Sequence, residues 1–158
     1  MKMMKKMKNS GFTLMELMIV IAIIAILAGV AIPNYIGFLP RQRLAAGAQD
    51  VLQGLQKSRS KAIMTNRPVV VNFNAAADSF TAFIDENADG ALDAGELTIA
   101  GRTMPAGIDL TTNLVGAVTA VTFDDQGIPT TSGTMTVQNS SGETQDIRLY
   151  LSGHSVLE

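Results

Sequence analysis

Residues 11–32 read GFTLMELMIVIAIIAILAGVAI and include a long apolar run. Within this run, the sixteen residues 17–32 carry no charge and no strongly polar group. Counted from Phe12, the run reaches about 20 residues, the length that an α-helix needs to span a bilayer core. It contains one ionisable residue, Glu16, and a carboxylate held at the bilayer centre costs on the order of 2.5–3.5 kcal/mol. Glu16 therefore has either a specific role or a position near the lipid headgroups.

The residues before Phe12 form a short basic arm with four lysines and no acidic residue. Such an arm before an apolar run is typical of the start of a signal peptide, and the positive-inside rule keeps it in the cytoplasm. The small-residue cleavage site that should follow the apolar run is missing. Gly11 instead stands directly before Phe12, at the beginning of the run.

The junction 11–17, GFTLMEL, resembles the class III signal of type IV pilins and type II secretion pseudopilins, with Met15 as a mild variation. In that family a prepilin peptidase cleaves after the glycine on the cytoplasmic face and methylates the new N-terminal phenylalanine. The resemblance implies cleavage between Gly11 and Phe12, N-methylation of Phe12 and retention of the apolar helix. Glu16 is fifth when Phe12 is counted as first, the position of the family's glutamate.

The role expected for Glu16 follows from the charge that cleavage creates. A cleaved chain carries a new α-amino group on Phe12, and methylation keeps its positive charge. In a fibre core, Glu16 of one subunit can pair with that ammonium group of a neighbour. Either charge buried alone would cost several kcal/mol. We therefore expect this pair to set the register in which subunits assemble through their N-terminal helices.

The charge of the chain is distributed unevenly. Residues 41–67 contain six basic residues and one acid, whereas residues 68–158 contain two arginines and twelve acids, a net charge of −10. An acidic head is not typical of a nucleic-acid-binding protein, so no nucleic-acid partner is expected. The chain has no cysteine, which excludes disulfides and thiol chemistry.

The pattern after the apolar run predicts a second helical segment followed by strands. Pro33 and Pro40 predict a curved or partly unwound stretch. Helical spacing then resumes up to Asn66-Arg67-Pro68, with an apolar stripe expected to pack on a sheet. The stripe consists of Leu44, Ala48, Val51, Leu52, Leu55, Ala62 and Ile63.

From Val69 onwards the period changes to two, which predicts short strands separated by turns. The predicted strands are 69–73, 80–84, 97–104, 108–110, 118–123, 134–138, 147–151 and 155–157. Short strands at regular spacing predict two packed antiparallel sheets. The predicted class is α+β: a long N-terminal transmembrane and packing α-helix followed by an antiparallel β-sandwich head, as in type IV pilins. The expected division is a leader at 1–11, a transmembrane helix at 12–32, its amphipathic continuation at 33–67 and a periplasmic head at 68–158.

Several later segments resemble the GspH/FimT branch of the pilin superfamily. They are residues 43–69, 85–90, 104–108, 123–127 and 151–154, with His154 where that branch commonly has arginine. The resemblance implies a minor pilin or pseudopilin at or near a fibre tip. It further implies an inner-membrane protein with a single span and no cofactor for catalysis. The implied partners are other pilins or pseudopilins, prepilin peptidase and the inner-membrane assembly platform.

Residues 85–96, DENADGALDAGE, fit the pattern of a calcium-binding EF-hand loop at every fixed position. Calcium takes six to eight oxygen ligands. The candidate ligands here are Asp85, Asn87, Asp89, the Ala91 carbonyl, Asp93 and Glu96. Strands are predicted on both sides of the loop, so it is not helix-loop-helix. The alternative interpretation is an acidic hairpin tip in which Asp and Asn serve as turn formers.

Three functions are open at this point, and no group of residues supports an enzyme. His154 is the only histidine, so neither a histidine-based triad nor a zinc site has partners. The first function is a minor subunit of a type II secretion pseudopilus in the GspH position. The second is a FimT/FimU-like minor pilin that initiates a type IV pilus. The third is a DNA-uptake pilin, which the acidic head disfavours.

Overall fold

The computed structural model describes residues 12–158, apart from the side chains of Pro33, Asn34 and Ile36. The chain divides into two compact units, with the boundary between Phe38 and Leu39. The long helix α1 (Leu14–Thr65) begins in the first unit and ends in the second. Eight strands follow α1 within the described residues.

The first unit contains the apolar half of α1. Leu14–Ile32 has a mean hydropathy of 2.8 and, in the chain alone, no buried residue. By length and composition this segment could cross a membrane. Such exposure of large apolar side chains is stable only if lipid or other proteins cover them.

The helix is not unwound at its two prolines, which rules out one of the two predicted outcomes. It is continuous from Leu14 to Thr65, with Pro33 and Pro40 both in helical conformation. Proline fixes φ near −65°, a helical value, and each proline removes only one backbone hydrogen bond. The helix ends where the sequence predicted: Asn66 adopts a positive φ of 52° and Pro68 follows. Asparagine tolerates this left-handed conformation better than most residues.

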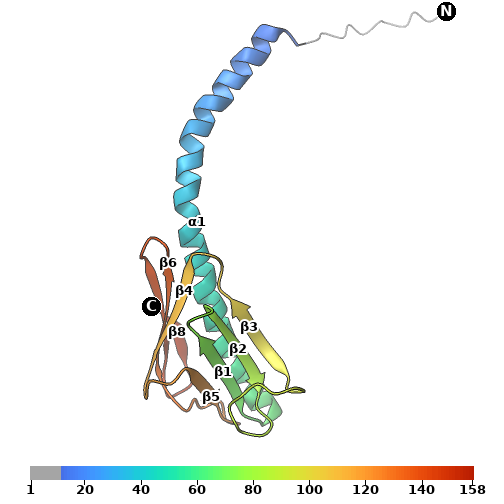
Figure 1. The fold of residues 1–158 in the computed structure, drawn as a ribbon, viewed down its shortest axis with the longest axis vertical. Coiled ribbons are helices and arrows are strands. Elements are labelled where there is room, and N and C mark those ends of the chain that lie inside the picture. Colours follow the sequence, from blue (N-terminus) through green and yellow to red (C-terminus); the bar gives the residue numbers. More distant parts are fainter. Residues whose placement is uncertain (1–11) are drawn as a thin grey trace, which may run out of the picture. The chain divides into compact units, whose positions relative to one another are not determined.

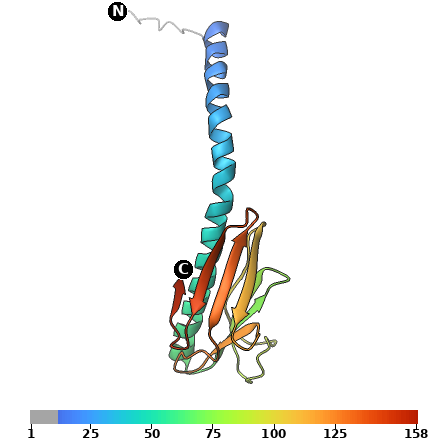
Figure 2. The same ribbon diagram turned by 90° about the vertical axis from the view of Figure 1, so that its left-hand side faces the viewer.

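The head consists of two four-stranded antiparallel sheets (Figures 1 and 2). The first sheet has the order β3-β2-β1-β5 and the second has the order β4-β6-β7-β8. The strands are β1 (Val69–Asn74), β2 (Ser79–Ile84), β3 (Thr98–Thr103), β4 (Ile108–Leu114), β5 (Ala120–Phe123), β6 (Gly133–Asn139), β7 (Thr144–Leu149) and β8 (Ser155–Leu157). All eight predicted strands are therefore present, and so is the predicted pair of antiparallel sheets.

The second half of α1 packs against both sheets. Its buried apolar residues share one core cluster with residues of the two sheets: Leu44, Ala48, Val51, Leu55 and Ala62. Glycines at two positions of α1 allow the helix to lie close to the residues packed against it. A Cβ at Gly47 would lie 3.2–3.5 Å from Met104, Ile108 and Val137, and a Cβ at Gly54 would lie 2.5 Å from the Phe80 ring. Only glycine fits at Gly54 without a shift of the helix or of Phe80.

Some boundaries and one core residue differ from the prediction. Ile63 is 50% exposed, because α1 turns it away from the core cluster that holds Ala62. β7 starts at Thr144 because Gln138 pairs with Thr144 across a tight turn, and Tyr150 already lies in the next turn. β4 continues to Leu114 because it pairs with β6 along its whole length.

Candidate functional site

The start of α1 is the first candidate site, and it carries Glu16. Thr13 precedes the first helical residue, and its hydroxyl accepts a hydrogen bond from the Glu16 N–H at 3.2 Å. The Glu16 Oε2 atom accepts bonds from the Thr13 N–H and the Thr13 hydroxyl, both at 2.9 Å. These reciprocal bonds are a capping box, which satisfies backbone donors that have no partner inside the helix.

The capping box gives Glu16 a local role that the sequence analysis missed. The signal for it was present, since T-x-x-E before an apolar run is the sequence pattern of this cap. In the chain alone, the carboxylate is held within its own first turn, next to Thr13. Gly11 lies outside the described residues, and Phe12 is the first described residue, with its side chain exposed.

The acidic loop between β2 and β3 is the second candidate site. Asp85 is only 3% exposed, and its carboxylate accepts hydrogen bonds from the N–H groups of Ala88 at 2.7 Å and Gly90 at 2.9 Å. At the other end of the loop, the Glu96 carboxylate accepts bonds from the N–H groups of Glu86 at 2.9 Å and Asp93 at 3.0 Å. Asp85 and Glu96, the first and last positions of the pattern, therefore hold the loop closed through hydrogen bonds to its own backbone.

The centre of the loop is occupied by an amide group. The Asn87 Nδ2 atom donates to Asp89 Oδ2 at 3.0 Å and to Asp93 Oδ2 at 2.9 Å. The two N–H groups of this amide thus lie between the carboxylates of Asp89 and Asp93. There they reduce the repulsion between the two negative charges, as a bound cation would. Asn87 Oδ1 faces the Asp89 N–H, and the Ala91 N–H donates to Asp89 Oδ1. Within residues 12–158, no three Asp, Glu, His or Cys residues are gathered closely enough to hold a metal ion.

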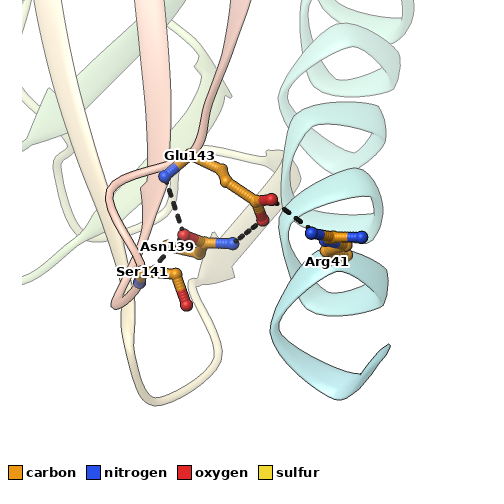
Figure 3. Close-up of polar contacts among 4 residues, drawn as sticks. All are labelled: Arg41, Asn139, Ser141 and Glu143. Atoms are coloured by element: carbon orange, nitrogen blue, oxygen red, sulfur yellow. Dashed lines mark hydrogen bonds and ion pairs between the residues drawn. The ribbon is translucent and has the colours of Figure 1, made fainter. Parts of the chain in front are cut away.

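The third candidate lies where α1 enters the head (Figure 3). Arg41 Nε on α1 donates to Glu143 Oε1 at 2.9 Å, and Asn139 Nδ2 donates to Glu143 Oε2 at 2.8 Å. Asn139 Oδ1 in turn accepts bonds from the N–H groups of Ser141 and Glu143, both at 3.0 Å. The buried Asn139 side chain thus shapes the β6–β7 turn, and Glu143 links this turn to the helix.

A groove between α1 and β3 was not predicted. Its volume is about 420 Å³, and its walls are α1 side chains, including Lys57, Lys61 and Met64, and Ile99 of β3. A smaller hollow of about 170 Å³ continues along β3 to Gly101 and Arg102. No linear motif marks this groove, because helical and strand residues far apart in the sequence line it together.

Two family descriptions match the chain. Residues 47–153 match "Type II transport protein GspH", and residues 6–32 match "Prokaryotic N-terminal methylation motif". The first match covers more than half of the chain and includes the whole region from the middle of α1 into the turn before β8.

The chain belongs to the GspH family. The resemblance to the superfamily of type IV pilins and pseudopilins is thereby confirmed. Members of the GspH family are structural subunits and not enzymes, and the family has no catalytic cofactor. The methylation motif and the apolar helix of this GspH-family chain are consistent with an inner-membrane prepilin.

Curated relatives agree with this family. The chain is 30% identical over 161 residues to the pilin-like protein PilA1 of Thermus thermophilus, covering 96% of this chain and all of that protein. It is 40% identical over 79 residues to the type IV major pilin protein PilA of Myxococcus xanthus, covering half of this chain and 30% of that protein. The second match therefore extends over less than a third of the major pilin.

Solved structures support the fold of the GspH-family head. The type IV minor pilin FimU of Pseudomonas aeruginosa matches with a TM-score of 0.61 at 19% identity, over 77% of this chain and 92% of that one. The minor pseudopilin EpsH of the Vibrio cholerae type 2 secretion system also matches with a TM-score of 0.61, at 16% identity, over 73% of this chain and 96% of that one. The fold is pilin-like, and the minor pilin and the minor pseudopilin match it with the same TM-score.

Proposed function

We propose that this protein is a minor pseudopilin of a type II secretion pseudopilus, inserted in the bacterial inner membrane with its head in the periplasm. The observation that carries the proposal is the presence of an N-terminal methylation motif and a GspH-family head in one chain. In this role the subunit assembles with other pseudopilins through its N-terminal helix, at or near the fibre tip. Prepilin peptidase and the inner-membrane assembly platform are the other partners.

An alternative is a minor pilin that initiates type IV pilus assembly, favoured by the similarity to FimU. The two functions differ in what deletion of the gene abolishes. Loss of secreted enzymes with normal piliation supports the pseudopilus, whereas loss of surface pili with normal secretion supports the pilus. A DNA-uptake role is disfavoured by the acidic head, with two arginines against twelve acids in residues 68–158.

Processing is the first step of the proposed function. Prepilin peptidase would cleave between Gly11 and Phe12 and methylate Phe12. The intact mass of the protein extracted from membranes should therefore equal that of N-methylated residues 12–158. A chain that keeps residues 1–11 in cells with active peptidase would refute this step.

Glu16 is proposed to pair with the α-ammonium group of a neighbouring subunit during assembly. Its carboxylate already accepts two bonds from Thr13, so it is positioned at the helix start where a cleaved N-terminus also lies. Glu16→Ala should leave membrane insertion intact and reduce the amount of protein in sheared fibres. Thr13→Ala is the matched control, because it removes the capping hydroxyl but keeps the charge. If both variants lose the same amount of incorporation, the cap and not the intersubunit pair explains the effect.

Calcium binding by residues 85–96 is a further part of the proposal. Calcium would replace the Asn87 amide between Asp89 and Asp93, while Asn87 turns over to present Oδ1. The ligands would then be Asp85, Asn87, Asp89, Ala91, Asp93 and Glu96. Five acids in twelve residues repel one another, and a divalent cation would offset that repulsion.

Thermal melting of the full-length protein in detergent tests the calcium site. A ligand that binds only the folded head at a hundredfold excess over Kd adds about 2.7 kcal/mol of stability. For a head of this size, where each kcal/mol raises the Tm by about 4–8 °C, we expect the Tm with calcium to exceed the Tm with chelator by roughly 10–20 °C. Magnesium should raise the Tm less, since it prefers a tighter octahedron. Asp93→Asn should remove the difference. Equal melting with calcium and with chelator would identify the loop as an acidic turn closed by its own hydrogen bonds.

A further inference from the structure

The outer edge of β3 is the feature from which a new interaction surface follows. β3 is the terminal strand of its sheet and pairs only with β2 (Figure 1). The Met104 N–H donates to the Asp78 carbonyl at 2.7 Å, which makes Ser79 and Thr103 a non-hydrogen-bonded pair. By the alternation of an antiparallel ladder, the N–H and C=O groups of Gly101 and Thr103 point away from β2. They form a free strand edge.

Gly101 in the middle of this edge is not required by the fold of the head. Its φ is not in the left-handed region, and a Cβ there would meet no heavy atom closer than the Phe80 carbonyl oxygen at 3.5 Å. That distance is an ordinary van der Waals contact, so a side chain would fit. Glycine weakens a strand, and within strands it often marks a place where another backbone approaches closely.

The groove beside this edge has the chemistry of a peptide-binding surface. It runs between α1 and β3, with Met64 (79% exposed) and Ile99 as apolar contacts. Lys57 and Lys61 line the same groove. None of the ion pairs found among residues 12–158 contains a lysine. The only acid in the adjoining hollow, Asp50, is already paired with Arg102 at 2.9 Å.

We propose that the β3 edge and its groove bind an extended, acidic segment of a partner protein as an additional strand. The partner backbone would pair with Gly101 and Thr103. Alternate side chains of the added strand would enter the groove, with apolar groups against Met64 and Ile99 and carboxylates near Lys57 and Lys61. Charge complementarity selects an acidic segment over a basic one. The surface is independent of which fibre the protein joins.

Binding can be tested on the full-length protein in detergent with two synthetic peptides, TVTETET and TVTKTKT, in which one face of the extended strand carries the valine and both charged groups and the other face carries only threonine. The acidic peptide should bind at least about tenfold more tightly than the basic one, because like charges are rejected. Hydrogen exchange should slow at the Gly101 and Thr103 amides when the acidic peptide is added. Exchange at the exposed edge of β4 serves as the internal reference.

Matched variants separate the proposed site from non-specific attraction. Thr103→Pro should weaken binding of the acidic peptide about fivefold or more, since it removes an N–H group on the free edge, where proline is tolerated because no bond to β2 is lost. Thr112→Pro, at the equivalent outward position of edge strand β4, is its control. Lys57→Gln with Lys61→Gln should abolish the preference for the acidic peptide. Gln42→Glu with Gln49→Glu changes the net charge of α1 by the same amount outside the groove and should preserve it.

The outcomes decide the proposal in either direction. Tight binding of the acidic peptide that is lost in the groove and edge variants, together with protection of Gly101 and Thr103, supports strand addition at β3. Failure of the acidic peptide to bind, equal affinity for both peptides, or protection elsewhere on the head overturns it. Since the assay uses neither secretion nor piliation, such a failure leaves the proposed fibre function unaffected.

Discussion

The two halves of α1 are both rich in apolar residues, yet they differ in what those residues contact. Leu27 in the first half is 63% exposed, whereas Leu55 in the second half is 1% exposed, within the core of the head. The second half packs on its own two sheets, whereas none of Leu14–Ile32 is buried in the chain alone. In one continuous helix, the apolar residues of the second half therefore stabilise the head, whereas those of the first half remain available for contacts outside the chain.

Truncation of one leucine in each half gives the largest expected difference. Leu55→Ala should lower the free energy of unfolding of the head by about 2–5 kcal/mol, because it leaves a cavity in the core. Leu27→Ala should leave it unchanged. Urea denaturation of the full-length protein in detergent, followed by circular dichroism of the strands, measures both. A similar loss in the two variants would mean that the head depends on the first half of the helix.

Replacement of one glycine by valine in each half of α1 should give a smaller difference in the stability of the head. Gly54→Val should destabilise the head by about 1–3 kcal/mol, because its Cβ would overlap the Phe80 ring. A Cβ at Gly29 would have no neighbour within 4 Å, so Gly29→Val should not lower the Tm of the head. Gly54→Val with Phe80→Leu should recover part of the loss. No recovery would indicate that the damage arises from the helix backbone and not from the contact with Phe80.

The ion pair between Arg41 and Glu143 gives the smallest expected effect. The two side chains are 72% and 40% exposed, and such pairs contribute about 0.2–1 kcal/mol. A double-mutant cycle of Arg41→Gln and Glu143→Gln should yield a coupling energy in this range that falls as salt is added. The Glu143→Gln single variant keeps an oxygen for Asn139, so the β6–β7 turn should persist. A coupling energy well above this range would show that the turn depends on its link to α1.

Much of the fold followed from local patterns in the sequence. The period of two after Val69 located all eight strands, and Asn66-Arg67-Pro68 located the end of the helix within one residue. The sequence left open whether α1 continues through Pro33 and Pro40. Each proline removes one backbone hydrogen bond, but the rest of a long helix keeps its hydrogen bonds and side-chain contacts. The helix can therefore continue through both prolines.

The candidate sites were predictable only in part. The residues of the acidic loop were identified by their spacing, but the position of the Asn87 amide between Asp89 and Asp93 depends on three-dimensional geometry. The contact of Arg41 with Glu143 joins residues 102 positions apart, and no local pattern indicates such a pair. The capping role of Glu16 was readable from T-x-x-E before an apolar run, which is the sequence pattern of this cap.

The pairing of β1 with β5 has a consequence for the order in which the head can form. Val69 pairs with Phe123, so the first sheet joins segments separated by 54 residues, and the second sheet is completed only by β8 at the C-terminus. Closing such long loops costs entropy before the contacts form, which slows folding. When the strands of the head become available in chain order, β1 and β2 can pair early, but the core stays open until β5 arrives. During that interval the face of α1 that the core later buries is exposed, and its apolar side chains are accessible to any chaperone that meets the chain.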